Sequence, residues 1–210
     1  MSQYYLNPIH PPVKNTSHYT TLGGAICGGP GYAPTPLLFL VPNRTWVPQT
    51  PYRPSSSSSK WRMTVDQTDR LAPGQSSVAF DHNGYMRQGM KMTQLYGKGS
   101  YTLGQMMNGA GDRVLMSTGL GKIRLYVRWP GYDEWIRPIE INTSSGPITR
   151  ADLAAAVALH VSRYFEAYYP MSNGPWRIAP SNGIRFDMLV LVSITNIFED
   201  VWQADIAVDS

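Results

Sequence analysis

Three side chains with the chemistry to bind nucleic acid alternate along one predicted strand. Arg124, Tyr126 and Arg128 share a face of the segment 122–129, whose other face is apolar. Cations on either side of an aromatic ring resemble the surfaces on which bases stack. An aromatic side chain from elsewhere in the chain could equally cover Tyr126 between the two arginines, or the row could simply face solvent. The row therefore predicts either a nucleic-acid-binding face or an ordinary solvated or covered strand.

Residues of the types used in catalysis are few and scattered along the chain. Cys27 lies among glycines without a charged neighbour, and the acidic pair 133–134 falls in a predicted turn, where adjacent side chains point apart. Metal sites need several converging ligands, and no histidine pair or carboxylate-rich loop has that spacing. The sequence predicts no catalytic residue, metal ion, cofactor or small-molecule ligand. An enzyme stays a further alternative, which would need a pocket joining His82 or His160 to a carboxylate.

The glycine-rich stretches 97–99 and 119–122 do not match a phosphate-binding motif. The first lacks the third glycine of a dinucleotide loop. The second lacks both the leading glycine and the Ser or Thr after lysine. Neither stretch lies between a predicted strand and a predicted helix, the order that phosphate binding at a helix N-terminus requires. Turns account for both stretches.

The elements that must position these residues are clearest in residues 122–210. Segments 122–129 and 135–141 alternate apolar and polar residues, as half-buried strands do. Pro138 cannot donate a ladder hydrogen bond, so the second segment should be an edge strand or carry a bulge. The β-branched residues of 184–197 and the alternation of 202–208 predict two more strands.

A long helix is predicted over 149–168, between the two pairs of strands. Thr149 is a typical N-cap, with Asp152 three residues later. The apolar positions that follow form one stripe: Leu153, Val157, Val161, Tyr164 and Tyr168. The order strand–strand–helix–strand–strand predicts an α+β fold, a small, mostly antiparallel sheet with one long helix on one face. In element order this is similar to β-grasp domains, a likeness that carries no binding residue.

Residues 1–60 are of a different kind, an irregular arm rich in proline. They hold 10 of the 17 prolines and no acidic residue, and proline blocks both helices and sheet ladders. Phe39, Trp46 and Tyr52 are among several aromatic residues there. The arm is predicted to be either an extended or disordered tail, or a strap whose aromatic residues dock on the folded body or on a partner. Residues 61–121, rich in glycine and methionine, are predicted to be a partly ordered lead-in.

Composition limits the class of protein. The chain has 210 residues, of which 42% are apolar and 15% charged, so a highly charged disordered chain and a long coiled coil are excluded. Residues 1–122 carry 11 basic and 4 acidic side chains, against 7 and 10 in residues 123–210. The basic residues are too dispersed to form a cluster. No apolar run has the length of a membrane span or of a secretion signal, which predicts a cytoplasmic or nuclear protein.

Two segments stand out by their sequence, Lys98-Gly-Ser-Tyr-Thr-Leu-Gly and Ile123-Arg-Leu-Tyr-Val-Arg-Trp-Pro-Gly-Tyr132. They resemble an uncharacterised domain family found in proteins of mushroom-forming fungi, and Trp202-Gln203 resembles a later strand of that family. The resemblance covers roughly residues 90–206. It implies a eukaryotic protein that is not secreted and has no catalytic function, and it supplies no site residues.

The leading hypothesis from the sequence is a non-enzymatic protein-interaction or assembly module. Its partner-binding residues would be Phe39, Trp46 and Tyr52 of the arm, with the sheet edge near Pro138 as a second contact. The partner would be another protein or a second copy of the chain. The alternative is a nucleic-acid-binding protein that uses Arg124, Tyr126 and Arg128.

Overall fold

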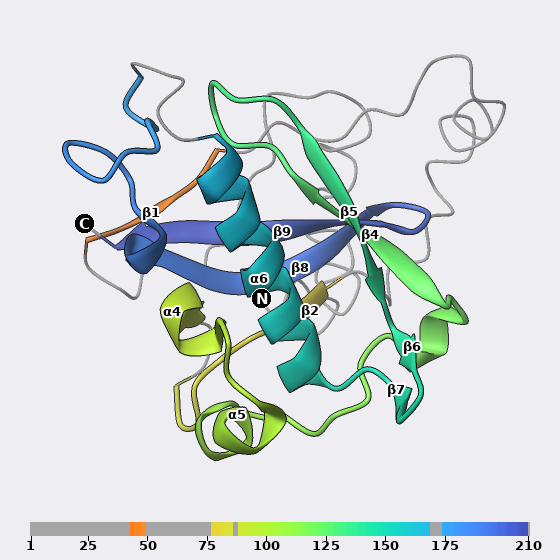
Figure 1. Cartoon of the computed structure of the whole chain (residues 1–210). Helices are drawn as coiled ribbons and strands as arrows, with labels where there is room; N and C mark the ends of the chain where they lie inside the picture. The colour runs from red at the N-terminus through yellow and green to blue at the C-terminus, as the bar shows by residue number, and fades with distance from the viewer. Residues whose placement is uncertain (1–42, 49–76, 86–87, 169–173, 210) are drawn as a thin grey trace, which may run out of the picture.

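A mixed, mostly antiparallel sheet forms the centre of the fold in the computed structural model, which describes residues 43–48, 77–85, 88–168 and 174–209 (Figure 1). The strand order is β2-β8-β9-β4-β5, with β1 paired to β9 and β3 paired to β8. Among these pairings only β4 with β9 is parallel. The strands are β1 (Arg44–Trp46), β2 (Ser77–Ala79), β3 (Met90–Lys91), β4 (Lys122–Val127), β5 (Trp135–Glu140), β8 (Leu189–Phe198) and β9 (Val201–Asp209). A separate two-stranded ladder joins β6 (Asn142–Thr143) to β7 (Gly146–Pro147).

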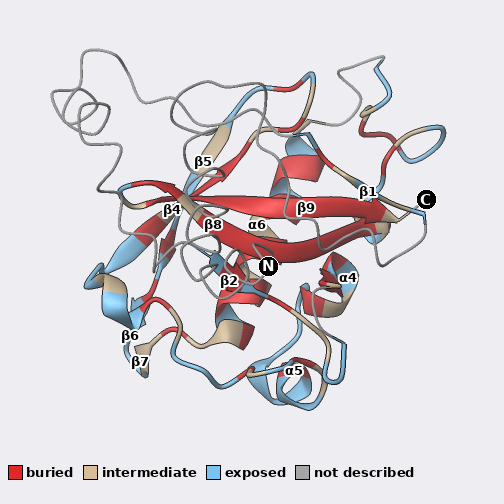
Figure 2. Cartoon of the chain, turned by 180° about the vertical axis from the view of Figure 1, so that it is seen from behind, coloured by how far each residue is buried: buried red, intermediate tan, exposed pale blue. Residues whose placement is uncertain are grey.

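The helices lie on one face of this sheet (Figure 1). They are α4 (Met92–Leu95), α5 (Ser100–Met106) and α6 (Arg150–Ala167), with 3-10 turns η4 (Met116–Thr118) and η5 (Phe186–Met188). Both α4 and α5 pack against α6. Seen from behind, β8 and β9 lie in front of α6 (Figure 2). The described part of the chain is thus an α+β fold with one helical layer.

The sequence determines where α6 begins and which side it buries. Thr149 is the N-cap, and its hydroxyl accepts a hydrogen bond from the Asp152 backbone N–H at 3.1 Å. Leu153, Val157 and Val161 of the predicted stripe are fully buried. They belong to the main core cluster, together with the helix-facing residues of β4, β8 and β9.

Residues 77–121 belong to the same core, so the expected division at residue 122 does not correspond to a break in packing. Phe80, Met90, Met92, Leu95 and Leu103 are all fully buried, and they share one cluster with residues of β4 and α6. Strand β3 has two residues and α4 has four. Elements this short are below the length at which periodicity can be recognised, which is why the sequence predicted only a partly ordered lead-in.

Part of the proline-rich arm is a strand. Residues Arg44–Trp46 form β1 and pair antiparallel with the end of β9. The Arg44 guanidinium donates to both carboxylate oxygens of Asp209, at 2.6 and 2.9 Å. Within residues 43–48 the arm is therefore extended and docked on the sheet, while Phe39 and Tyr52 lie outside the described residues.

Two strand predictions can be compared directly with the sheet. Strand β5, which contains Pro138, lies at the end of the strand order, so the prediction of an edge strand is confirmed. The strand predicted from residue 184 begins only at Leu189, because residues Phe186–Met188 form η5 instead. There, Arg185 donates two hydrogen bonds to Asp187, each 2.9 Å long, which favours a local turn.

Candidate protein-binding site

An apolar groove opens at the surface between the C-terminal half of α6 and the loop that leads into η5. Its cavity has a volume of about 260 Å³. Its apolar lining consists of Phe165, Ile178, Ala179, Pro180, Ile184 and Phe186. Ser162, Glu166 and Arg185 supply the polar part of the wall. We call this site the aromatic groove.

Aromatic contacts fix the two rings that form the groove. Phe165, on α6, meets the buried Trp129 ring edge to face, with centroids 5.0 Å apart. Phe186, on η5, contacts Phe165 at 6.4 Å and Tyr96 at 5.7 Å, both edge to face. Tyr96 is 42% exposed, so the aromatic surface continues beyond the cavity. Edge-to-face pairs add to the stability gained from buried area, and they hold both walls of the groove in place.

Hydrogen bonds hold the loop that forms the far wall. The Ile184 backbone N–H donates to the Arg177 carbonyl at 2.7 Å, and the Ala179 N–H donates to the Ile184 carbonyl at 3.2 Å. The Ile178 N–H donates to the Tyr132 hydroxyl at 2.8 Å. The loop is thus closed on itself and attached to the turn after β4. The groove is preformed on both sides.

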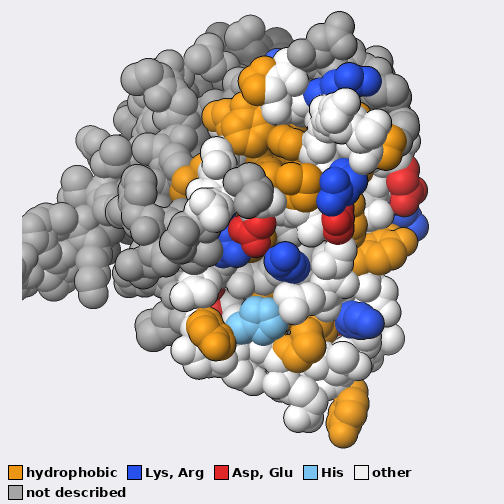
Figure 3. Space-filling model, turned by 90° about the vertical axis from the view of Figure 1, so that its left-hand side faces the viewer, with side chains coloured by type: hydrophobic (Ala, Val, Ile, Leu, Met, Phe, Trp, Pro, Cys, Tyr) orange, Lys and Arg blue, Asp and Glu red, His pale blue; other side chains and the backbone are white. Residues whose placement is uncertain are grey.

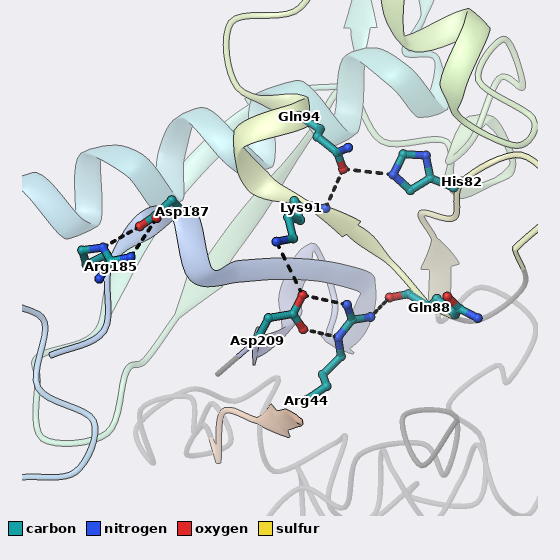
Figure 4. Close-up of polar contacts among 8 residues, drawn as sticks. All are labelled: Arg44, His82, Gln88, Lys91, Gln94, Arg185, Asp187 and Asp209. Carbon is teal, nitrogen blue, oxygen red and sulfur yellow. Dashed lines mark hydrogen bonds and ion pairs between the residues drawn. The ribbon is translucent and has the colours of Figure 1, made fainter. Parts of the chain in front are cut away.

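Ion pairs lie beside the groove on the same face (Figure 3). Arg185, in the groove wall, pairs with Asp187, and this hydrogen bond holds the pKa of Asp187 below its ordinary value. The Lys91 ammonium lies 4.0 Å from the Asp209 carboxylate, which also binds Arg44 (Figure 4). The surface therefore has an apolar centre bordered by paired charges, the arrangement typical of protein interfaces.

The polar contacts next to α4 are structural in character. Arg44 also donates to the Gln88 carbonyl, which ties β1 to the chain just before β3 (Figure 4). His82 Nε2 lies 2.9 Å from Gln94 Oε1, and the same oxygen accepts from the Lys91 backbone N–H at 3.3 Å. His82 thus contacts an amide, whereas the enzyme alternative needs a histidine beside a carboxylate.

The predicted row of Arg124, Tyr126 and Arg128 does not form an open platform. Tyr126 is fully buried in a small apolar cluster, which agrees with the covered-strand alternative. Arg124 donates to Asp200 at 2.9 and 2.5 Å. Arg128 lies 3.9 Å from Glu134. Strand β4 lies between β9 and β5, and both faces of an interior strand can be buried even where its sequence alternates.

A second, larger concavity lies beside Arg124, where β4 begins and β8 turns into β9. Its volume is about 920 Å³. The charged side chains of its lining are Lys122, Arg124, Glu140, Glu199 and Asp200. A phosphate backbone entering here would meet three carboxylates beside two cations, a poor match for a polyanion. Nucleic-acid binding stays a prediction from the sequence.

Of the three arm residues predicted to bind a partner, the structure describes Trp46. It is partly buried and packs on Val190, Val192 and Ala207, on the sheet face opposite α6. The sequence missed the groove residues Phe165 and Phe186. Phe186 lies within the segment 184–197 that the sequence predicted as a strand, so nothing in the sequence indicated that it faces a groove.

Comparisons with known proteins give no family for this chain: no family model, curated protein or solved structure matches it. The resemblance to the fungal domain family therefore stays a prediction.

Within the described residues, His, Cys, Asp and Glu side chains form no group of three or more that could hold a metal ion. In the same part of the chain, no helix has the length and apolar character needed to cross a bilayer.

His160, on α6, should make stability depend on pH. Burial lowers its pKa below the ordinary value, and the charges of Arg163 and Arg137 lower it further, while the Pro138 carbonyl offsets part of the shift. Below about pH 6.5, an ordinary histidine in the unfolded chain takes up a proton more readily than the folded protein does. His160 therefore contributes stability above that pH, and the contribution is lost as the pH falls towards the folded-state pKa.

Urea unfolding of the wild type and of His160→Gln at pH 7.5, 6.5 and 5.5 measures this effect. We expect the wild type to lose more stability than the variant between pH 7.5 and 5.5. The other histidines are the same in both proteins, so their contribution cancels in the comparison. Equal losses in the two proteins would show that the pKa of His160 does not change on folding.

Proposed function

We propose that this protein is a non-enzymatic assembly module whose aromatic groove binds the apolar segment 37–41 of a second copy. The observation that carries this proposal is the open apolar cavity of about 260 Å³, walled by Phe165 and Phe186 and bordered by ion pairs. An apolar side chain that displaces water from such a cavity stabilises the complex. Exposed apolar surface of this kind is typical of interaction sites.

The arm is the partner whose chemistry fits best. Residues 37–41 read Leu-Leu-Phe-Leu-Val, an apolar run with Phe39 at its centre, and no acidic residue occurs in residues 1–60. Residues 123–210, which carry the groove, contain 10 acidic against 7 basic side chains. The arm joins the body at Arg44, within the polar cluster that borders this face (Figure 4). Apolar and electrostatic complementarity both favour the pairing.

The finer description of the fold belongs to the same proposal. Strands β4 and β5, helix α6, and strands β8 and β9 follow one another along the chain, with the small β6–β7 ladder between β5 and α6. This succession supports a β-grasp-like ββαββ unit extended by β1, β2 and β3. A cytoplasmic or nuclear location, expected from the sequence, completes the proposal.

The test compares the oligomeric state of the full chain with that of two variants over a range of concentrations, by light scattering after size exclusion. We expect Phe186→Ser to raise the dissociation constant of self-association about tenfold or more, because a buried phenylalanine contributes roughly 1.5–3 kcal/mol. Phe39→Ser should weaken association to a similar degree, since it removes the opposite side of the same contact.

Tyr101→Ser is the matched control, because Tyr101 is an aromatic residue that is 84% exposed and lies outside the groove lining. It should leave association unchanged. A full chain that stays monomeric at every concentration would contradict the proposal. Association that Phe186→Ser and Phe39→Ser leave intact would assign the interface to another surface.

A further inference from the structure

Another cavity, which we call the arginine pocket, lies between β2, η4 and the start of α6. Its volume is about 310 Å³. Among the described residues of its lining, the charged ones are Arg113 and Arg150, and none is acidic. By contrast, the larger concavity beside Arg124 has three carboxylates in its wall. The lining of the arginine pocket therefore has the charge that an anion requires.

Arg150 is held in place at the wall of this pocket. Its guanidinium donates to the Ala79 carbonyl at 2.6 Å and to the Gly109 carbonyl at 3.2 Å. It also donates to the Asp112 carboxylate at 3.0 Å, and this carboxylate offsets part of its charge. The side chain is only 21% exposed. A ligand would therefore meet a guanidinium that is already oriented, which lowers the entropic cost of binding.

Arg113 supplies the cation that no carboxylate neutralises. It donates to the Pro147 carbonyl, and it forms no ion pair with another described residue. Its backbone is fixed to the start of α6, because Arg113 forms a β-bridge with Thr149 and the Arg150 N–H donates to the Asp112 carbonyl at 2.9 Å. A guanidinium with unused donors is the group that binds a carboxylate or a phosphate through paired hydrogen bonds.

A phosphate group fits this arrangement better than a carboxylate. Its terminal oxygens can accept from two guanidinium groups and from a hydroxyl at the same time, and Ser77 and Ser117 bring hydroxyls to the same lining. A single arginine is enough for a carboxylate. The apolar part of the wall consists of Val78, Val114, Leu115 and Met116. The cavity is larger than a phosphate group and is at the small end of the range for ligand pockets.

We propose that the arginine pocket binds a small phosphate monoester, whose phosphate contacts both arginines and whose organic part contacts the apolar wall. Met116 is 66% exposed, so the wall beside η4 is open to an entering ligand. The site shares no lining residue with the aromatic groove, and it is independent of the proposed self-association. Arg113 and Arg150 are distant in sequence, which is why no motif indicated this pocket.

Titration of the isotope-labelled full chain with phenyl phosphate, followed by NMR at constant ionic strength, tests the site and the ligand class. We expect saturable shifts concentrated in the amides of residues 113–118 and 150. Inorganic phosphate should bind the same site more weakly, because it lacks an apolar part. Benzoate, which carries the same ring on a carboxylate, should bind at least about tenfold more weakly than phenyl phosphate. No shift at about 10 mM phenyl phosphate, or shifts centred elsewhere, would overturn the site. Equal binding of benzoate would overturn the assignment to a phosphate.

Arg113→Gln tests the role of the unpaired arginine. We expect this variant to raise the dissociation constant for phenyl phosphate about tenfold or more, because it removes a charge-assisted pair of hydrogen bonds. Arg163→Gln is the matched control: it removes the same charge from an exposed position of α6 outside the pocket and should leave binding unchanged. Equal weakening by both substitutions would show a general attraction of anions and overturn the proposal. Phe186→Ser should bind as the wild type does, which separates this site from the aromatic groove.

Discussion

Replacing Trp129 by alanine is expected to lower the free energy of unfolding by about 3–5 kcal/mol, the range for removal of a large buried aromatic side chain. Trp129 is fully buried and lies among the largest side chains of the core. Its ring packs edge to face on Phe165 at 5.0 Å and on Trp176 at 6.2 Å. Its indole N–H donates to the Trp176 carbonyl at 2.7 Å. Alanine would leave a cavity, two rings without support and a carbonyl without its donor.

Trp129→Phe separates these contributions. Phenylalanine keeps an aromatic ring but cannot donate to the Trp176 carbonyl, so the loss should be smaller, about 1–3 kcal/mol. Urea unfolding followed by circular dichroism measures the free energy of unfolding of all variants. The control is Tyr101→Ala, at an exposed position, which should change that free energy by close to zero. A Trp129→Ala protein as stable as the Tyr101→Ala control would show that the core is not built around this ring. Because Phe165 forms one wall of the aromatic groove, Trp129→Ala should also weaken self-association.

The parts of the fold that the sequence predicted are those where one local rule determines the outcome. Thr149 caps α6 because its side chain accepts from the Asp152 N–H, a contact made within one turn. Pro138 marks an edge strand because it lacks an N–H, whatever its surroundings. Both features depend only on neighbours in the chain, so they can be read without knowing the fold.

The parts that the sequence missed depend on contacts between distant segments. Tyr126 occupies the polar side of an alternating strand, yet it is buried with Ile197 and Phe198 of the β8–β9 hairpin. Strand β1 is three residues long and forms only because β9 offers an edge. The aromatic groove joins Phe165 to Phe186 across 21 positions in sequence. Periodicity within a segment carries no information about such pairs.

Gly89, just before β3, requires glycine for two separate reasons. Its φ is +73°, a conformation that costs roughly 1–2 kcal/mol for residues with a Cβ. A Cβ at this position would also lie 2.6 Å from the Leu191 carbonyl oxygen and 2.8 Å from a Val190 methyl. The oxygen belongs to the backbone of β8, to which β3 is paired, so it cannot move away without breaking the sheet. Gly89→Ala should therefore lower the free energy of unfolding by about 2–5 kcal/mol.

Gly97→Ala is the matched control, because Gly97 has a similar φ of +66° while its Cβ position faces open space. Gly97→Ala should lower the free energy of unfolding only by the conformational cost of roughly 1–2 kcal/mol. The difference between the two variants in urea unfolding then measures the steric contact with β8 alone. Gly89 directly follows Gln88, whose carbonyl accepts a hydrogen bond from Arg44 of β1. Arg44 also binds Asp209 of β9. Displacing residues 88–91 should thus also loosen β1, and hydrogen exchange in β1 should be faster in Gly89→Ala than in Gly97→Ala. Equal stabilities and equal exchange in the two variants would mean that β8 yields to the added methyl group, and that β1 is held independently of β3.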